Sequence, residues 1–203
     1  MNSLSHYELI ELPDAVLHWY PEALDPGQAR FWFDCLLKEL EWQTEQLQLF
    51  GRKMTVPRML AWCGDAGASY RYSGVNHEPQ DWTGTLESIR SWIQETSNSP
   101  FNGVLANRYR DGNDCMGWHS DDEPELGKQP VIASLSLGAS RLMRFRRRGD
   151  HSQSYRLELS AGSLLIMRGT TQKYWQHCIG RSRKFTDERI NLTFRFIDNA
   201  CKT

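Results

Sequence analysis

Three side chains from two separate stretches of the sequence could bind one metal ion. His119 and Asp121 form an H-x-D unit, and residues two apart in extended backbone point to the same side. His177 lies in a later segment, where Trp175 and Ile179 share its alternation phase. Two histidines and one carboxylate form the facial triad of non-haem iron(II) oxygenases, which leaves positions open for a cosubstrate and oxygen. Zinc accepts the same ligands, so the triad predicts a metal site without choosing the metal.

The segment 189–196 carries a second set of polar side chains. Its odd positions are polar and its even positions are apolar, so one face packs on a core and the other lines something polar. A guanidinium group facing an interior is costly unless paired, and its shape matches a carboxylate. 2-Oxoglutarate has two carboxylates and would suit Arg189 and Arg195 beside an iron ion. The alternative is an edge strand whose arginines face water, and the nearby triad favours the ligand.

Two helices and a series of short strands must position these groups. Asp25 as N-cap, Pro26 at the first helical position and Gln28 in a capping box predict one helix, and a second begins near Thr85 and ends at residues 98–100. From Phe101 onward, short alternating segments separated by Gly, Asp and Asn are typical of an antiparallel sheet or barrel. The expected strands are 102–109, 117–119, 131–137, 142–147, 155–159, 163–167, 174–178 and 189–197. Eight such strands predict a jelly roll, and the fold class is therefore mainly β with flanking helices.

The composition indicates one globular domain over residues 1–203. Hydrophobic residues make up 39% and charged residues 24%, which is enough apolar material for a single core. The five cysteines are scattered with no C-x-x-C pair, so reduced thiols are expected. No apolar run is long enough to span a bilayer and no leader pattern is present, which predicts a cytoplasmic protein, or a nuclear one in a eukaryote. The protein is also expected to be a monomer. With a net charge of −1, a nucleic-acid partner would have to be held locally.

Taken together, four motifs resemble the AlkB family of oxidative nucleic-acid dealkylases. They are Asn107-Arg108-Tyr109, the H-S-D-D-E run 119–123, His177, and the R-x-N-x-T-F-R run 189–195. The resemblance runs from about Trp42 to the end of the chain. The segments 56–58, 64–67 and 70–74 are most similar to the branch that repairs duplex DNA. The resemblance implies a double-stranded β-helix core over about 101–203 and a β-hairpin nucleotide-recognition lid over about 42–76.

The resemblance also implies cofactors and a reaction. Fe(II) would be bound by His119, Asp121 and His177, and O2 would be the oxidant. Tyr109 and Arg189 would hold the distal carboxylate of 2-oxoglutarate, and the full set of residues around this cosubstrate would be Asn107, Tyr109, Arg189, Asn191, Thr193 and Arg195. The implied reaction is oxidative demethylation of bases such as 1-methyladenine and 3-methylcytosine in DNA, with release of succinate and formaldehyde.

Lesions of this kind are cationic, so carboxylates beside the iron would attract them. By resemblance Glu123, and with it Asp122, contacts the base; the alternative is an acidic turn that continues through Glu125. A base in a duplex must be flipped out before it can react, which calls for a stacking platform and a wedge. The resemblance assigns the platform to Tyr72 and Ser73, the wedge to Leu49, Phe50 and Gly51, and phosphate contacts to Arg58, Arg181, Arg183 and Lys184. In the alternative interpretation Phe50 is part of the core.

Two other functions remain open at this point. One is an Fe(II)/2-oxoglutarate oxygenase that acts on RNA, a protein side chain or a small metabolite, because the iron chemistry is common to all of them. The other is a lesion-binding protein without turnover, which the complete ligand set argues against. Exposure of Phe50 and Tyr72 at the mouth of the site would favour nucleic acid, and formaldehyde release would separate an enzyme from a binding protein.

Overall fold

The computed structural model describes residues 7–49, 52–68, 70–72 and 75–198. Side chains are described outside 47–53 and 69–77. The elements are β1 (Glu8–Leu12), β2 (Ala15–Tyr20), α1 (Pro26–Glu39), β3 (Gln43–Leu49), β4 (Arg52–Gly64), β5 (Tyr70–Tyr72), β6 (Val75–His77), α2 (Gly84–Ser97), β7 (Gly103–Tyr109), β8 (Met116–His119), a 3-10 turn (Pro124–Leu126), β9 (Ile132–Gly138), β10 (Arg141–Arg147), β11 (Asp150–Leu159), β12 (Leu164–Arg168), α3 (Thr171–Tyr174), β13 (Trp175–Ile179) and β14 (Arg189–Arg195). None of the helices in these ranges is long and apolar enough to cross a membrane.

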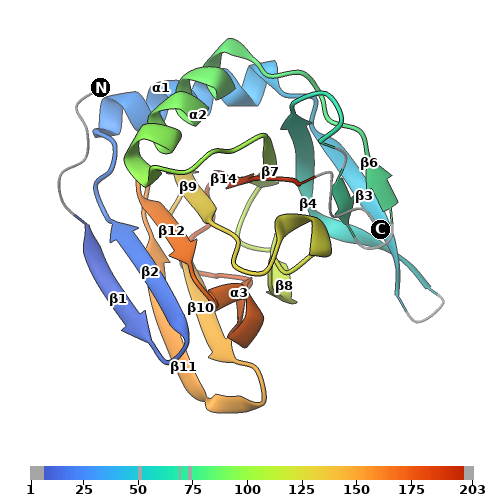
Figure 1. Cartoon of the computed structure of the whole chain (residues 1–203). Helices are drawn as coiled ribbons and strands as arrows, with labels where there is room; N and C mark the ends of the chain where they lie inside the picture. Colours follow the sequence, from blue (N-terminus) through green and yellow to red (C-terminus); the bar gives the residue numbers. More distant parts are fainter. Residues whose placement is uncertain (1–6, 50–51, 69, 73–74, 199–203) are drawn as a thin grey trace.

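Two antiparallel sheets face each other as a jelly roll. The major sheet has the order β1-β2-β12-β9-β14-β7-β4-β3, and the minor sheet has the order β11-β10-β13-β8. Helices α1 and α2 lie across the outer face of the major sheet (Figure 1). The order shows that strands distant in sequence become neighbours, since β14 lies between β9 and β7. The predicted jelly roll and the predicted fold class are confirmed.

Alternation along β14 divides its side chains between two environments. Ile190, Leu192 and Phe194 are fully buried in the core between the major sheet and the helices, where each such side chain contributes roughly 1.5–3 kcal/mol. Arg189 and Arg195 lie on the opposite face of the strand, toward the minor sheet, and are also buried. The edge-strand alternative for 189–196 is therefore wrong, because β14 is in the middle of the sheet.

The helix boundaries follow from their caps. The Asp25 side chain accepts a hydrogen bond from the Gln28 backbone N–H at 3.0 Å, as predicted. Helix α2 begins at Gly84, slightly before the predicted start, because Thr83 is its cap and accepts from the Leu86 N–H at 3.2 Å. It ends where Asn98 adopts a left-handed conformation with φ 48°. Helices α1 and α2 pack on the outer face of the major sheet, away from the metal-ligand residues.

The N-terminal forty residues and the region 42–76 both add strands to the core. Strands β1 and β2, which the sequence did not predict, extend the major sheet beside β12. At the other edge β4 pairs with β7 only from Met59 to Gly64, while residues nearer its start pair with β3 alone. The distal part of the β3–β4 hairpin therefore projects beyond the core (Figure 1).

Candidate metal and cosubstrate site

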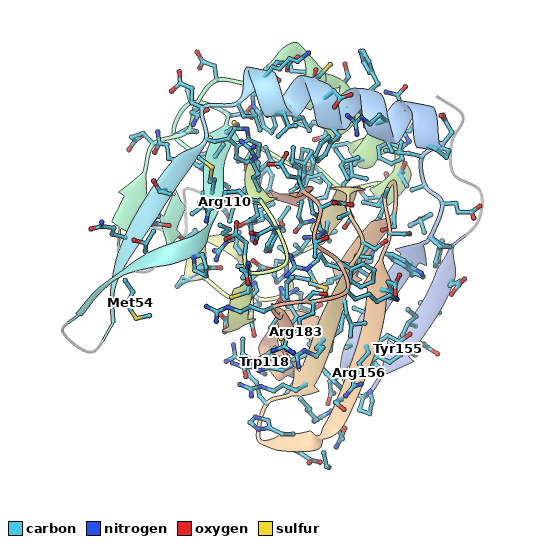
Figure 2. The ribbon with its side chains drawn as sticks, turned by 180° about the vertical axis from the view of Figure 1, so that it is seen from behind. Met54, Arg110, Trp118, Tyr155, Arg156 and Arg183 are labelled. Carbon is cyan, nitrogen blue, oxygen red and sulfur yellow. The ribbon has the colours of Figure 1, made fainter. Side chains whose placement is uncertain are left out.

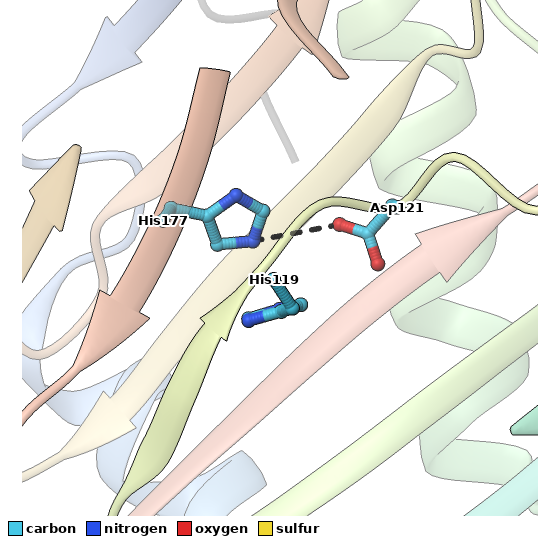
Figure 3. A group of neighbouring side chains, drawn as sticks. All are labelled: His119, Asp121 and His177. Carbon is cyan, nitrogen blue, oxygen red and sulfur yellow. Dashed lines mark ion pairs between the residues drawn. The ribbon is translucent and has the colours of Figure 1, made fainter. Parts of the chain in front are cut away.

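The three predicted metal ligands meet on the inner face of the minor sheet. His119 ends β8, His177 is in the middle of β13, and the register pairs the two residues directly. Asp121 follows two residues after His119, and one ligand atom from each of the three lies within 4.8 Å of the others. Figure 3 shows the three side chains converging, with His177 Nε2 at 3.6 Å from Asp121 Oδ2. The H-x-D spacing and the strand alternation thus bring the three side chains together.

Hydrogen bonds orient the ligands. His119 Nδ1 lies 2.9 Å from the Gly117 carbonyl oxygen, and because that oxygen only accepts, Nδ1 carries the proton and Nε2 keeps a lone pair. The Asp121 backbone N–H donates to Gln172 Oε1 at 3.0 Å, and the Ser120 hydroxyl donates to the Trp175 carbonyl at 2.8 Å. Sequence reasoning missed Gln172, which lies in the polar run Thr170-Thr171-Gln172-Lys173 and belongs to no motif. Contacts of this kind fix ligand geometry around a metal.

One oxygen of Asp121 has the character of a metal ligand. Its Oδ1 accepts a hydrogen bond from Arg195 Nε at 3.2 Å and a second, short one from Arg195 Nη2. Its Oδ2 is buried and has no hydrogen-bond partner among the described residues. A buried carboxylate oxygen without a partner is costly unless a cation satisfies it. The donor set and this orphaned oxygen fit a divalent metal ion.

The charge states of the ligands also fit. Burial, together with the charge of His119, lowers the pKa of the His177 imidazole to about 3, so this side chain is neutral at physiological pH. Burial tends to raise the pKa of Asp121, but Arg195 and the two histidines outweigh it and hold this pKa well below its usual value. Neutral imidazole and ionised carboxylate are the forms that bind metals.

Arg189 is a buried cation that forms no ion pair with any acidic residue in the part of the chain that the structure describes. It is fully buried, its Nη2 donates to Ser136 Oγ at 2.9 Å, and its Nε and Nη1 have no hydrogen-bond partner among the described residues. Burial lowers the pKa of Arg189 to about 10, which leaves it charged at neutral pH, and the nearby Tyr109 works against this lowering. The Arg189 guanidinium lies 5.1 Å from the Tyr109 ring centroid. A buried guanidinium with unsatisfied N–H groups is suited to bind one carboxylate group of a diacid such as 2-oxoglutarate.

The residues expected around 2-oxoglutarate gather through strand pairing. Arg189 pairs with Tyr109 and Asn191 with Asn107, across β14 and β7. A single cavity is lined by the metal ligands and by five of the six expected cosubstrate residues, namely Asn107, Tyr109, Asn191, Thr193 and Arg195. Arg189 is the sixth; it is not one of the lining residues, but its guanidinium lies over the ring of Tyr109, which is. The Asn191 amide donates to Ser134 Oγ and to the Leu135 carbonyl, each at 2.9 Å, so it is already fixed in place.

Several expected substrate residues lie elsewhere than the sequence indicated. Arg58 is only 3% exposed and donates from Nε to Asn107 Oδ1 at 2.7 Å, so its assignment as a surface phosphate contact is wrong. Asp122 is exposed and forms an ion pair with Arg148 at 2.6 Å, while Glu123 is half-buried. Leu49 is in β3 and Tyr72 in β5, but their side chains lie outside the described residues, as do Phe50, Gly51 and Ser73.

Comparison with known proteins agrees with this geometry. The model of the 2OG-Fe(II) oxygenase superfamily matches residues 16–195. The Homo sapiens protein named DNA oxidative demethylase ALKBH2 is 42% identical over 175 residues, which cover 81% of this chain and 67% of that protein. Alpha-ketoglutarate-dependent dioxygenase alkB homolog 3 of Mus musculus is 38% identical over 191 residues, covering 88% of this chain and 65% of that protein. The chain thus spans slightly less than two thirds of the latter.

A solved structure, that of OsALKBH1, superposes with a TM-score of 0.63 at 18% identity, covering 93% of this chain and 100% of that one, and supports the fold. The chain is therefore a member of the 2OG-Fe(II) oxygenase superfamily and, within it, of the AlkB family. The superfamily's name specifies Fe(II) and 2-oxoglutarate, and its oxygenase chemistry uses O2.

Proposed function

We propose that the protein demethylates N-alkylated bases such as 1-methyladenine and 3-methylcytosine in DNA, as a direct reversal of damage. The observation that carries this proposal is the convergence of His119, Asp121 and His177 within 4.8 Å, with a buried Asp121 oxygen that lacks a hydrogen-bond partner. When bound, iron and 2-oxoglutarate would supply the oxidation of the N-methyl group, with decarboxylation of the diacid to succinate. The hydroxylated methyl group would then leave as formaldehyde.

The residues of this chain would hold the reactants. Arg189 and Tyr109 would bind the distal carboxylate of 2-oxoglutarate, because the Nε and Nη1 nitrogens of Arg189 have N–H groups to donate and no ion pair joins Arg189 to another described residue. Arg58 would position Asn107 through the 2.7 Å hydrogen bond between them. Arg195 would keep Asp121 ionised and oriented for the metal, in addition to lining the cosubstrate cavity. The remaining expected residues, Asn191 and Thr193, would line the same cavity.

On the substrate side, Glu123 is the stronger candidate for contact with a cationic base. The Asp122 carboxylate is paired with Arg148, so it offers little net charge, and Arg148 also donates to Ser120 Oγ at 2.8 Å. The proposed stacking platform remains Tyr72 with Ser73, and the proposed wedge remains Leu49, Phe50 and Gly51. The distal part of the β3–β4 hairpin supports this, because its described residues pair only with each other and project beyond the core.

The decisive test is formaldehyde release by purified protein with Fe(II), O2 and DNA oligonucleotides that contain 1-methyladenine. We expect formaldehyde in proportion to repaired base, only with 2-oxoglutarate, on single and double strands. Parallel reactions with methylated RNA, and with the free methylated nucleoside, separate the alternatives. Repair of RNA alone, or of nucleoside alone, would contradict the proposed substrate. Tight lesion binding without any formaldehyde would indicate a binding protein.

Replacing Phe50 by alanine should reduce repair of duplex DNA more than repair of single strands. An apolar wedge fills the gap left by a flipped base, and unstacking costs a few kcal/mol that only a duplex requires. The measurement is initial rate on matched single- and double-stranded substrates. Met54→Ala on the same hairpin, where the side chain is 55% exposed, is the control. Equal losses on both substrates would remove the wedge hypothesis.

Replacing Glu123 by glutamine should weaken the preference for cationic lesions. Two unit charges about 4 Å apart interact by about 1 kcal/mol in water and by about 4 kcal/mol near a protein surface, so we expect the preference for 1-methyladenine over a neutral methylated base to fall at least about fivefold. The measurement is the ratio of kcat/KM values for the two lesions. Glu125→Gln, two residues away in the 3-10 turn, should leave the ratio unchanged. An unchanged ratio in Glu123→Gln would contradict the assignment.

A further inference from the structure

Arg141, at the start of β10, is a second buried cation near the residues expected around 2-oxoglutarate. It is 1% exposed, and no ion pair within 4.0 Å joins it to an acidic residue in the described ranges. Strand alternation puts its side chain on the same inner face of β10 as those of Met143 and Phe145. Met143 lines the cosubstrate cavity, and the Phe145 ring centroid lies 5.9 Å from that of His177. Along this face, Arg141 is therefore farther from His177 than the other two residues.

Arg141 ties two loops together through their backbones. Its Nη1 donates to the Asp111 carbonyl at 3.2 Å, and its Nη2 donates to the carbonyls of Asp114 and Gly180 at 2.7 and 2.6 Å. Asp111 and Asp114 are in the loop between β7 and β8, whereas Gly180 begins the loop between β13 and β14. A guanidinium group presents its donors in a fixed plane, so this one side chain sets the distance between the two loops.

The same two loops also contact each other directly. The Ser182 backbone N–H donates to the Gly112 carbonyl at 2.8 Å, and a Cβ atom at Gly112 would collide with the Ser182 carbonyl oxygen. Figure 2 shows both loops from behind the molecule, where Arg110 marks the first and Arg183 the second. The two loops and the buried Arg141 therefore form one packed unit.

This unit adjoins the residues expected at the distal carboxylate of 2-oxoglutarate. Tyr109 is the last residue of β7 and Arg189 is the first of β14, so each is attached to one of the two loops, and the register pairs them. The Arg141 guanidinium lies 5.3 Å from the Tyr109 ring centroid, and that of Arg189 lies 5.1 Å from it. Two buried cations thus contact one ring, and neither has an ion-pair partner in the part of the chain that the structure describes. Buried positive charge of this kind is costly until an anion binds beside it.

The two cations also affect each other. Burial is the main reason why the pKa of Arg189 falls to about 10, and the positive charge of Arg141 adds to this effect. Burial likewise lowers the pKa of Arg141. A carboxylate placed near both groups would favour their charged forms and would itself be stabilised by them.

We propose that Arg141 is a positioning residue that makes the site selective for a dicarboxylate cosubstrate. It holds the two loops so that Tyr109 and Arg189 meet, and its charge adds to the positive potential where a distal carboxylate would lie. A 2-oxo acid without that second carboxylate gains nothing from this charge, so Arg141 raises the affinity for 2-oxoglutarate selectively. The inference rests on the proposed binding of the distal carboxylate by Arg189 and Tyr109.

The test is anaerobic titration of the Fe(II)-loaded protein with 2-oxoglutarate and with 2-oxobutyrate, which keeps the 2-oxo acid group but lacks the distal carboxylate. Binding is followed by the visible absorption that a 2-oxo acid gives when it chelates Fe(II), and the measured quantity is the ratio of the two affinities. No turnover is needed.

Two substitutions separate charge from geometry. In Arg141→Gln, whose amide can still donate to a loop carbonyl, we expect the ratio to fall roughly tenfold because the charge near the carboxylate is lost. In Arg141→Lys we expect a fall of roughly threefold, because an ammonium group keeps the charge but neither stacks on Tyr109 nor reaches both loops. In both variants the affinity for 2-oxobutyrate should stay within about twofold of the wild-type value.

The matched control is Arg108→Gln, which removes the same charge from the residue next to Tyr109, where it is paired with Glu188 at 2.5 Å. This control should keep the wild-type ratio. A wild-type ratio in Arg141→Gln or in Arg141→Lys overturns the inference, and so does an equal loss of affinity for both acids, which is the result of a purely structural role. Arg189→Gln is the reference for the proposed function and should lower the ratio further; a wild-type ratio there would place the distal carboxylate elsewhere and contradict the proposed cosubstrate site itself.

Discussion

Replacing Asp121 by alanine should lower demethylation by well over 100-fold and abolish tight Fe(II) binding. Loss of an outer partner of a metal ligand already costs about 10- to 100-fold in metal affinity or activity, and here a ligand itself is removed. The variant would leave the two histidines in place, so weak binding of a soft divalent ion is the most that should survive. Iron binding is measured by titration under anaerobic conditions, and activity by formaldehyde release.

A second effect of Asp121→Ala follows from its partner. Arg195 is 2% exposed and hydrogen-bonds through Nε and Nη2 to Asp121 Oδ1, so the variant leaves a buried guanidinium without its counter-charge. Breaking a buried ion pair in this way costs about 3–5 kcal/mol. We therefore expect a lower free energy of unfolding for the metal-free variant, and Arg195→Met/Asp121→Ala should recover part of it.

The two effects can be separated. The double variant should be more stable than Asp121→Ala yet equally inactive, because stability depends on the charge pair whereas activity depends on the ligand. His18 in β2, which is far from the three ligands in the sequence, provides the matched control. His18→Ala removes a titratable side chain that is no part of the metal site. Near wild-type iron affinity in Asp121→Ala would contradict the assignment of the metal site.

The sequence predicts the metal ligands well because their geometry is local. His119 and Asp121 are two residues apart, and the alternation of side chains along an extended backbone puts both on the same side of it. The position of His177 follows from the same alternation once the strand is recognised, although its direct pairing with His119 depends on the sheet order. The polar face of residues 189–195 is equally local, whereas the pairing of Arg189 with Tyr109 and of Asn191 with Asn107 depends on which strands become neighbours in the sheet.

The features that the sequence did not reveal all depend on contacts between distant segments. Arg58 was expected to contact a phosphate, but it lies just before the part of β4 that pairs with β7, and its buried side chain donates to Asn107. Asp122 looked available for substrate until the β10–β11 connection brought Arg148 within 2.6 Å. Strands β1 and β2 carry no motif, and they join the sheet only because β12 offers a free edge. Long-range pairing of this kind leaves no periodic signal in the chain.

Replacing Arg189 by glutamine should raise the KM for 2-oxoglutarate strongly while making the metal-free protein more stable. Removing one partner of a buried charge pair costs about 2–5 kcal/mol of binding, or roughly 30- to 5000-fold in affinity. In the absence of a diacid the same guanidinium is fully buried, and its Nε and Nη1 have no hydrogen-bond partner among the described residues, so its removal should increase the free energy of unfolding.

The substitution is thus expected to weaken cosubstrate binding and to stabilise the metal-free protein, and a general folding defect would not produce both effects. The measurements are KM and kcat at saturating 2-oxoglutarate, and thermal unfolding with and without the cosubstrate. Wild-type protein should gain stability when 2-oxoglutarate is added, because a ligand that binds only the folded state shifts the equilibrium toward it, and Arg189→Gln should lose most of this gain. Arg108→Gln, which removes a neighbouring arginine that is paired with Glu188 at 2.5 Å, should change neither quantity substantially. An unchanged KM in Arg189→Gln would mean that the diacid is held elsewhere, and a destabilised metal-free variant would mean that this buried charge is already compensated within the fold.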